Sequence, residues 1–234
     1  MDLKIYIPTS NRTVFTIEAL QHSYRKYWPD YTSNTFTILG YEKPGFELDS
    51  NWEFIQLNDF DDVHNWAQDL KGFFENIEDD FFIYANDDCP LSRPVDTDLL
   101  NKLFKLTDSN TSIGRISLTA DVQRRPHTTI ASMESFDLIE SGPLYRLSTQ
   151  YGIWNRNFFL KYIKGQMTPW DFETIHPVND GYNVLATKNR YCIDFYHLWR
   201  KTGLCHDWSE SAFEKTQLKD NAEDYTIIKR VLNL

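Results

Sequence analysis

The sequence predicts an α/β fold with a mixed, mostly parallel sheet flanked by helices, in the manner of Rossmann-like proteins. Within about the first 85 residues, short apolar stretches alternate with longer segments of helical periodicity. This alternation is typical of parallel strands that are joined by helices. The 234 residues can bury a large core, and 41% hydrophobic and 25% charged residues exclude a disordered chain.

The first half contains the clearest elements. Pro8 ends an apolar strand, the polar run Thr9-Ser10-Asn11 can cap a helix, and Pro29 closes that helix. The expected strands are Leu3–Ile7, Thr35–Leu39, Glu53–Leu57 and Phe81–Ala85, and the expected helices are Val14–Tyr27 and Val63–Asn76. Ligands bind beyond the carboxyl ends of parallel strands, so the segments after the first and fourth strands are candidate binding sites.

The second half is less regular. The expected helices are Val95–Leu106, Asn155–Lys164, a short one that begins near Phe172, and Ala222–Leu232; the expected strands are Ser112–Thr119, Pro143–Leu147 and Tyr191–Leu198. No repeat or low-complexity linker interrupts the chain. We therefore expect one domain over residues 1–234, with one ligand bound by about residues 1–94 and another by about residues 95–234.

Charge and cysteine content narrow the class of protein. The net charge of −10 argues against a broad nucleic-acid or anionic-membrane surface. Cys89, Cys192 and Cys205 show no CxxC spacing, so neither a disulfide framework nor a cysteine zinc site is expected. The start MDLKIYIP lacks a signal-peptide pattern, and no apolar run approaches the roughly 18 residues of a membrane span. We expect a cytoplasmic protein without a transmembrane segment.

Two adjacent carboxylates follow the fourth expected strand, in the sequence Asn86-Asp87-Asp88. Carboxylates at a strand end are good ligands for a hard divalent cation, and Mg²⁺ or Mn²⁺ in turn bridges phosphates. The alternative is a solvated turn that ends the strand. The apolar strand before the motif and its place in the α/β unit favour the metal site.

The segment Pro8–Arg12 follows the first expected strand and precedes a helix. Backbone N–H groups and hydroxyls at a helix N-terminus favour a phosphate or a nucleobase. The segment lacks the glycine-rich spacing of a dinucleotide fingerprint or a P-loop, which disfavours those folds. An ordinary helix cap is the alternative.

Two carboxylates alternate with two aromatic residues in Thr168–Glu173, at an expected helix start. Asp171 or Glu173 could act as a general base for an acceptor hydroxyl. The alternative is a helix cap whose negative charge suits the helix dipole.

In this order the three segments resemble those of GT-A-fold glycosyltransferases. Gln150–Leu160 followed by TPWDFE looks like the Q…IW…FL…PW-FE pattern of small bacterial and viral glycosyltransferases. Tyr196, followed by Lys201 and Gly203, looks like their late tyrosine and K-x-G element. The resemblance covers roughly residues 3–205, and the motif NDD in place of D-x-D leaves open which aspartate binds the metal directly.

The resemblance implies a GT-A-like domain that transfers a sugar, with inversion, from a nucleoside diphosphate sugar to a saccharide hydroxyl. A UDP-sugar is the favoured donor, and Mn²⁺ or Mg²⁺ is the implied cofactor. The implied nucleotide-sugar residues are Pro8, Thr9, Asn11, Arg12, Asn65, Trp66, Asp69, Asn86, Asp87 and Lys201. The implied metal ligands are Asp87, Asp88 and His197, the catalytic base is Glu173 or Asp171, and the acceptor would stack on Trp154 and Trp170.

Three further classes of protein fit the sequence. A phage-type enzyme that glycosylates hydroxymethylated pyrimidines in DNA would suit the compact, aromatic-rich chain. A local positive region, formed by Arg115, Arg124, Arg125 and His127, could bind DNA, a phosphorylated acceptor or a lipid diphosphate. The favoured alternative is an exposed loop that binds no ligand. The surrounding stretch from Asp121 to Ser135 lacks periodicity and is expected to be a mobile loop. The second class is a nucleotidyltransferase, which is disfavoured because no glycine-rich, lysine-containing loop follows the first strand. The third is a non-catalytic protein that binds a nucleotide sugar or a glycan.

Overall fold

The first half of the chain forms parallel strands. The computed structural model describes residues 3–120, 129–133, 136–139, 146–175, 180–187, 190–200, 203–204 and 221–233. The strand β1 (Lys4–Pro8) pairs with β2 (Thr35–Gly40) on one side and with β4 (Phe81–Tyr84) on the other, and β2 pairs with β3 (Trp52–Gln56). The four strands expected here are confirmed within one or two residues.

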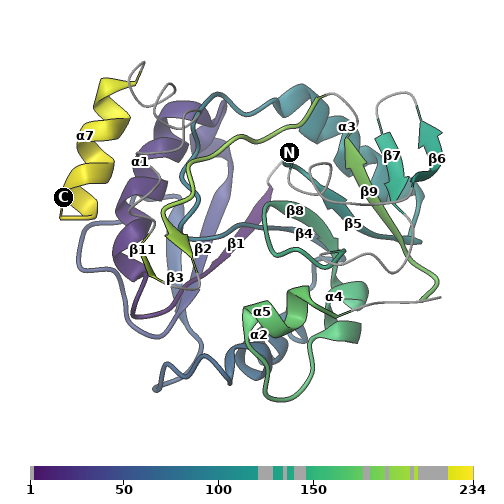
Figure 1. The fold of residues 1–234 in the computed structure, drawn as a ribbon, viewed down its shortest axis with the longest axis horizontal. Helices are drawn as coiled ribbons and strands as arrows, with labels where there is room; N and C mark the ends of the chain where they lie inside the picture. The colour runs from purple at the N-terminus through teal and green to yellow at the C-terminus, as the bar shows by residue number, and fades with distance from the viewer. Residues whose placement is uncertain are drawn as a thin grey trace.

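The second half extends the sheet with strands of both directions. Among the described residues, nine strands form one sheet in the order β3-β2-β1-β4-β8-β5-β9-β7-β6 (Figure 1). The strand β8 (Gly152–Asn155) lies antiparallel between β4 and β5 (Ile113–Ser117). The strand β9 (Asn183–Thr187) is parallel to β5, β7 (Phe136–Ile139) is antiparallel to β9, and β6 (Thr129–Met133) is antiparallel to β7. The pair β10 (Trp199–Arg200) and β11 (Gly203–Leu204) forms a separate ribbon.

Helices cover both faces of the sheet. Apolar side chains of α1 (Ile17–Tyr27) and α3 (Thr97–Ser109) pack on one face, and those of α2 (Trp66–Phe74), α4 (Arg156–Tyr162) and α5 (Pro169–Glu173) pack on the other. The helix α7 (Ala222–Val231) lies against the outer side of α1 (Figure 1). Short 3₁₀ turns, η1 (Val14–Thr16) and η2 (Tyr31–Ser33), precede α1 and β2. The chain is therefore an α/β protein with a mixed, mostly parallel sheet, as the sequence predicts.

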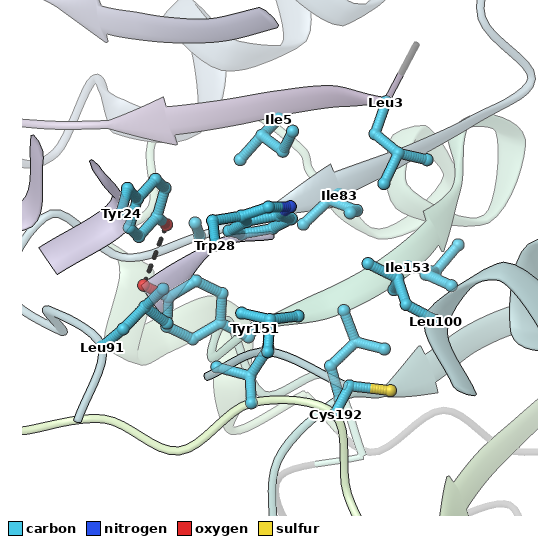
Figure 2. Packing of buried hydrophobic residues seen from close by; sticks show 14 of the residues in the cluster. Leu3, Ile5, Tyr24, Trp28, Ile83, Leu91, Leu100, Tyr151, Ile153 and Cys192 are labelled. Carbon is cyan, nitrogen blue, oxygen red and sulfur yellow. Dashed lines mark hydrogen bonds between the residues drawn. The ribbon is translucent and has the colours of Figure 1, made fainter. Parts of the chain in front are cut away.

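Alternation along the central strands divides the core into two layers. Ile5 of β1 and Ile83 of β4 face the layer of α1 and α3, where Trp28 and Leu100 also lie (Figure 2).

A short chain of hydrogen bonds links the layer of α1 and α3 to the loop after β4. Tyr24 donates to the hydroxyl of Tyr151 at 2.9 Å, and Tyr151 donates to the carbonyl of Cys89 at 2.6 Å. The core is thus connected directly to the segment that follows Asp88.

Several expected elements differ in the structure. Residues 191–198 do not form a strand; only Phe195 makes an isolated antiparallel bridge, with Leu91. The opposing segment contains Pro90 and Pro94, which have no N–H to donate, so a continuous ladder cannot form. Neither β8 nor β9 is predicted by the sequence. The loop expected through residue 135 is wrong for Thr129–Met133, which is β6, and the described end of the expected strand 143–147 is a turn.

The described part of the chain contains no helix that is long and apolar enough to cross a membrane.

Candidate active site

The carboxyl ends of β1 and β4 meet at one edge of the sheet, and their side chains are joined there. Thr9, directly after β1, donates its hydroxyl hydrogen to Oδ2 of Asp87 at 2.5 Å. Thr16 donates to the backbone carbonyl of Asp87 at 2.9 Å. Thr9 and Asp87 are 8% and 9% exposed, so this contact is almost shielded from solvent. The structure therefore brings together the two segments that the sequence singles out.

The two aspartates of the NDD motif are adjacent and buried at this edge. Burial and the neighbouring charge of Asp88 raise the pKa of Asp87, although hydrogen bonds from Thr13 and Thr9 lower it in part. Asp88 is itself only 8% exposed. A divalent cation at this position would relieve the repulsion between the carboxylates.

His197 lies beside Asp88 and completes a set of possible metal ligands. Its Nε2 atom is 3.3 Å from Oδ2 of Asp88. Two backbone hydrogen bonds hold this segment against the loop after β4: Leu198 N–H to Asp88 at 2.8 Å, and Tyr196 N–H to Pro90 at 2.8 Å. The ligand atoms of Asp88, Cys89 and His197 lie within 4.8 Å of one another.

The chemistry of these side chains fits a cation of intermediate hardness. Burial and the charge of Asp88 raise the pKa of the Cys89 thiol, so it stays protonated and is a poor ligand. The thiol instead contacts Oδ1 of Asp88 at 3.4 Å. The carboxylate of Asp88 and the imidazole of His197 suit Mn²⁺ better than Mg²⁺, because Mg²⁺ prefers oxygen ligands alone. Asp87, whose Oδ2 accepts from Thr9, is not a member of this group of ligand atoms.

Glu173, at the end of α5, lies at the same edge of the sheet. Its Oε1 atom accepts hydrogen bonds from the backbone N–H and the hydroxyl of Thr149, at 2.7 and 2.8 Å. Thr149 closely precedes β8, whose first residue, Gly152, pairs with Tyr84 at the end of β4. Burial and the charges of Asp87 and Glu173 raise the pKa of Tyr84. The Tyr84 hydroxyl thus lies within the electrostatic reach of both carboxylates.

Asp171 has a structural partner. Its Oδ2 atom accepts hydrogen bonds from the backbone N–H and the hydroxyl of Thr168, at 2.9 and 2.7 Å, and Thr168 in turn caps the backbone N–H of Asp171. This reciprocal arrangement is a capping box, with Pro169 in the first turn of the helix. The geometry therefore gives Asp171 the helix-capping role that the sequence left as the alternative.

The two tryptophans expected to contact an acceptor differ in exposure. Trp154 is fully buried, and its ring packs among Phe158, Phe159 and Phe172. No face of this ring is open to a saccharide, so stacking on Trp154 is excluded. Trp170, at the start of α5, is 36% exposed and remains accessible.

Arg115 is likewise part of the interior. Its side chain is fully buried on β5, its guanidinium lies 5.2 Å from the ring centroid of Trp154, and it donates to the carbonyl of Gln150 at 3.3 Å. Arg115 therefore cannot belong to an open positive groove. Arg124, Arg125, His127 and Lys201 lie outside the described residues.

The expected nucleotide-binding residues lie in two groups. Pro8 and Thr9 are buried at the end of β1, Asn11 and Asn86 are half-buried, and Arg12 is exposed. The second group surrounds the N-terminus of α2, where Asn65 precedes the helix, Trp66 packs in the same apolar cluster as Tyr84, and Asp69 accepts from the Tyr41 hydroxyl at 3.0 Å. Trp66 is thus the member of this second group that shares an apolar cluster with the end of β4.

Asp61 contacts the first of these groups, although it is not among the residues expected from the sequence. Its Oδ2 atom accepts a hydrogen bond from the backbone N–H of Asn11 at 2.6 Å. The run Asp59–Asp62 begins two residues after the strand expected at Glu53–Leu57. The rule that the carboxyl ends of parallel strands share one edge could therefore have identified it.

Comparisons with known proteins give a fold but no family. No protein-family model matches the sequence, and no curated protein does. The fold is similar to that of CMP:2-keto-3-deoxy-manno-octonic acid synthetase in complex with CTP, with a TM-score of 0.52 and 12% identity over 95% of this chain and 100% of that chain. It is also similar to apo-UDP-glucose pyrophosphorylase, with a TM-score of 0.50 and 10% identity over 94% and 100% of the two chains. At these identities the likeness shows a shared α/β architecture.

Proposed function

We propose that this chain is a metal-dependent, inverting glycosyltransferase that uses a nucleoside diphosphate sugar, with a UDP-sugar favoured. The observation that carries the proposal is the meeting of Thr9, Asp87 and Asp88 at one sheet edge that also holds Glu173. Asp87, Asp88 and His197 would hold Mn²⁺, which would stabilise the negative charge of the departing diphosphate. The similar folds of proteins named for CMP- and UDP-linked sugars support a nucleotide sugar as ligand.

Glu173 would serve as the general base. Thr149 holds its Oε1 atom, so Oε2 is the oxygen that would take the proton from the acceptor hydroxyl. The acceptor oxygen would then attack the anomeric carbon on the face opposite the diphosphate, which inverts that centre. The segment Pro8–Arg12, together with Asn65, Trp66, Asp69 and Asn86, would hold the nucleotide sugar, and Trp170 would contact a saccharide acceptor.

A thermal-shift screen of nucleotide sugars with and without Mn²⁺ tests this proposal. A ligand that binds only the folded state raises the melting temperature by mass action. We expect a UDP-sugar to raise it in Mn²⁺, no such shift in EDTA, and loss of the shift in Asp88→Asn. Full sugar transfer in EDTA would contradict the metal role, and failure of every nucleotide sugar to bind would contradict the proposal as a whole.

Nucleotidyl transfer is the second candidate, because both similar structures are named for enzymes that make or cleave a nucleotide sugar. Against it, Pro8–Arg12 contains neither glycine nor lysine. Release of pyrophosphate from CTP or UTP with a sugar phosphate would favour this candidate. Release of UDP from a UDP-sugar would favour glycosyl transfer.

A saccharide is a better acceptor candidate than DNA. The positive region suggested by the sequence loses Arg115, which is buried, and the net charge of −10 repels a polyanion. We expect no binding of duplex DNA at physiological salt and transfer that is insensitive to ionic strength. Transfer onto hydroxymethylated DNA, with a salt slope of about −0.9 per phosphate contact, would promote the alternative.

A further inference from the structure

A groove lies between the edge strand β3 and the helix α2, and it shares one residue, Asp69, with the residues proposed to hold the nucleotide sugar. Its volume of about 450 Å³ is in the range of small-ligand sites. None of Asp87, Asp88 and Glu173 lines it. The floor is apolar and is formed by half-buried side chains: Ile55, Leu57, Phe73 and Ile77.

The sides of the groove are polar but almost uncharged. They are formed by three amides and one carboxylate: Gln56, Gln68, Asn76 and Asp69. Gln68 is exposed, and its amide makes no hydrogen bond to the described residues. Among the residues that the structure describes, no Lys, Arg or His lines the groove, and Asp69 disfavours an anion. The lining therefore suits a neutral ligand that bears hydroxyl groups.

Gly72 lines the groove and leaves it without a side chain at that position. It lies in the interior of α2, where a glycine is unfavourable relative to alanine. A Cβ atom at this position would meet nothing within 4 Å, and its φ is not in the left-handed region. Neither close packing nor backbone geometry requires a glycine here. The missing side chain leaves room in the groove that Gly72 lines.

We propose that this groove binds a neutral saccharide. The C–H face of a sugar ring would pack on the apolar floor, in which Phe73 supplies an aromatic ring, and the hydroxyls would bond to the amides of Gln56, Gln68 and Asn76. The site is a binding site without catalytic groups. The proposal does not depend on the proposed sugar transfer, since binding is measured without turnover.

Filling the groove is the direct test. Gly72→Trp places an indole in the open space, and Gly45→Trp is the matched control, because a Cβ at Gly45 also meets nothing within 4 Å and Gly45 lies outside the groove. The probes are maltohexaose, cellohexaose and chitohexaose, with hexagalacturonate as an acidic comparison. We expect at least one neutral hexasaccharide to give saturable amide shifts at Gln68, Gly72 and Phe73. Its affinity should fall at least about tenfold in Gly72→Trp and stay unchanged in Gly45→Trp.

Gln68→Ala is a second variant, chosen because Gln68 is exposed and its loss leaves the fold intact. This variant should also bind the neutral hexasaccharide more weakly than wild type does. The proposal is overturned if no neutral hexasaccharide binds, if binding persists in Gly72→Trp, or if hexagalacturonate binds as tightly. A wild-type dimer that Gly72→Trp dissociates in sedimentation would assign the groove to a second copy of the chain and would also overturn it.

Discussion

Thr9 donates its hydroxyl hydrogen to the carboxylate of Asp87 and so joins the loops that follow β1 and β4. The two residues are 78 positions apart in sequence. The contact follows from the parallel pairing of β1 and β4, which brings the carboxyl ends of both strands to one edge. The geometry of the NDD motif therefore depends on a residue outside that motif.

Removing the Thr9 hydroxyl tests whether the geometry of the NDD motif depends on it. In Thr9→Val the shape is kept but the hydrogen bond to a buried carboxylate is lost, and such bonds contribute about 1.5–3 kcal/mol. We expect Mn²⁺ to bind roughly tenfold or more weakly in calorimetric titration, since 1.4 kcal/mol is a factor of ten. Thr107→Val is the control, because Thr107 is buried on α3 and donates only to the carbonyl of Phe104. Equal Mn²⁺ affinity in wild type and Thr9→Val would show that Thr9 does not position Asp87.

The two carboxylates of α5 should separate into a chemical and a structural role. Glu173→Gln keeps the shape and removes proton acceptance, so kcat should fall by about 10²–10⁴ while the nucleotide sugar still binds. Asp171→Ala should instead lower the free energy of unfolding by about 1 kcal/mol, because it breaks the capping box. Steady-state kinetics and urea unfolding of both variants check this. A large loss of kcat in Asp171→Asn with normal turnover in Glu173→Gln would reverse the assignment.

A buried ion pair gives a prediction about acid stability. The side chains of Arg146 and Asp180 are 0% and 2% exposed and lie 2.7 Å apart. Although burial raises the pKa of Asp180, the hydrogen bond from Arg146 holds it below its usual value. The stabilisation is present above the unfolded pKa of about 3.9 and is lost as pH falls through the lowered folded value.

Asp180→Asn should therefore cost about 3–5 kcal/mol at pH 7, because it leaves the Arg146 charge buried without its partner. The difference in the free energy of unfolding between this variant and wild type should become smaller below about pH 3.9. Asp108→Asn, at an exposed position of α3, is the control and should stay within about 0.5 kcal/mol of wild type. A pH-independent difference would contradict the assigned role.

Substitution by alanine should have opposite effects on stability at two glycines. Gly72→Ala should raise the free energy of unfolding by about 0.5–1 kcal/mol, because the position is helical and open. Gly114→Ala should destabilise the protein, since its Cβ would lie 2.7 Å from the ring of Phe158. Thermal unfolding of both variants checks the contrast, with a shift of about 2–4 °C expected per kcal/mol. A lower melting temperature for Gly72→Ala would show that the glycine is needed by the fold.

The strands β1 and β4 could be predicted because each contains an apolar run, residues 5–8 and 81–84, that is followed by a polar motif. The strand β8 could not be predicted, because Gly152–Asn155 is short and lies in a segment whose residue types equally suit a binding motif. Trp154 shows the same ambiguity, because the sequence does not distinguish an aromatic residue that lines a cleft from one that fills the core. The contacts of its ring with Phe158, Phe159 and Phe172 decide that it is buried.

The candidate site was predictable in part for a similar reason. The rule about strand ends identifies Thr9 and Asp87 without knowledge of any contact. The role of Glu173 depends on Thr149, and the sequence does not show that these residues meet. Asp171 and Glu173 are two residues apart on a helix and point in different directions, so spacing alone leaves both as candidates.

The position of β8 has a consequence for synthesis on the ribosome. The strand β4 needs β8 to pair its second edge, yet β8 follows β5, β6 and β7 in the chain. Until residues 152–155 have emerged, the apolar strand Phe81–Tyr84 presents an open edge, and such edges can pair with other chains. The growing chain is therefore most prone to self-association while the segment between β4 and β8 is being made.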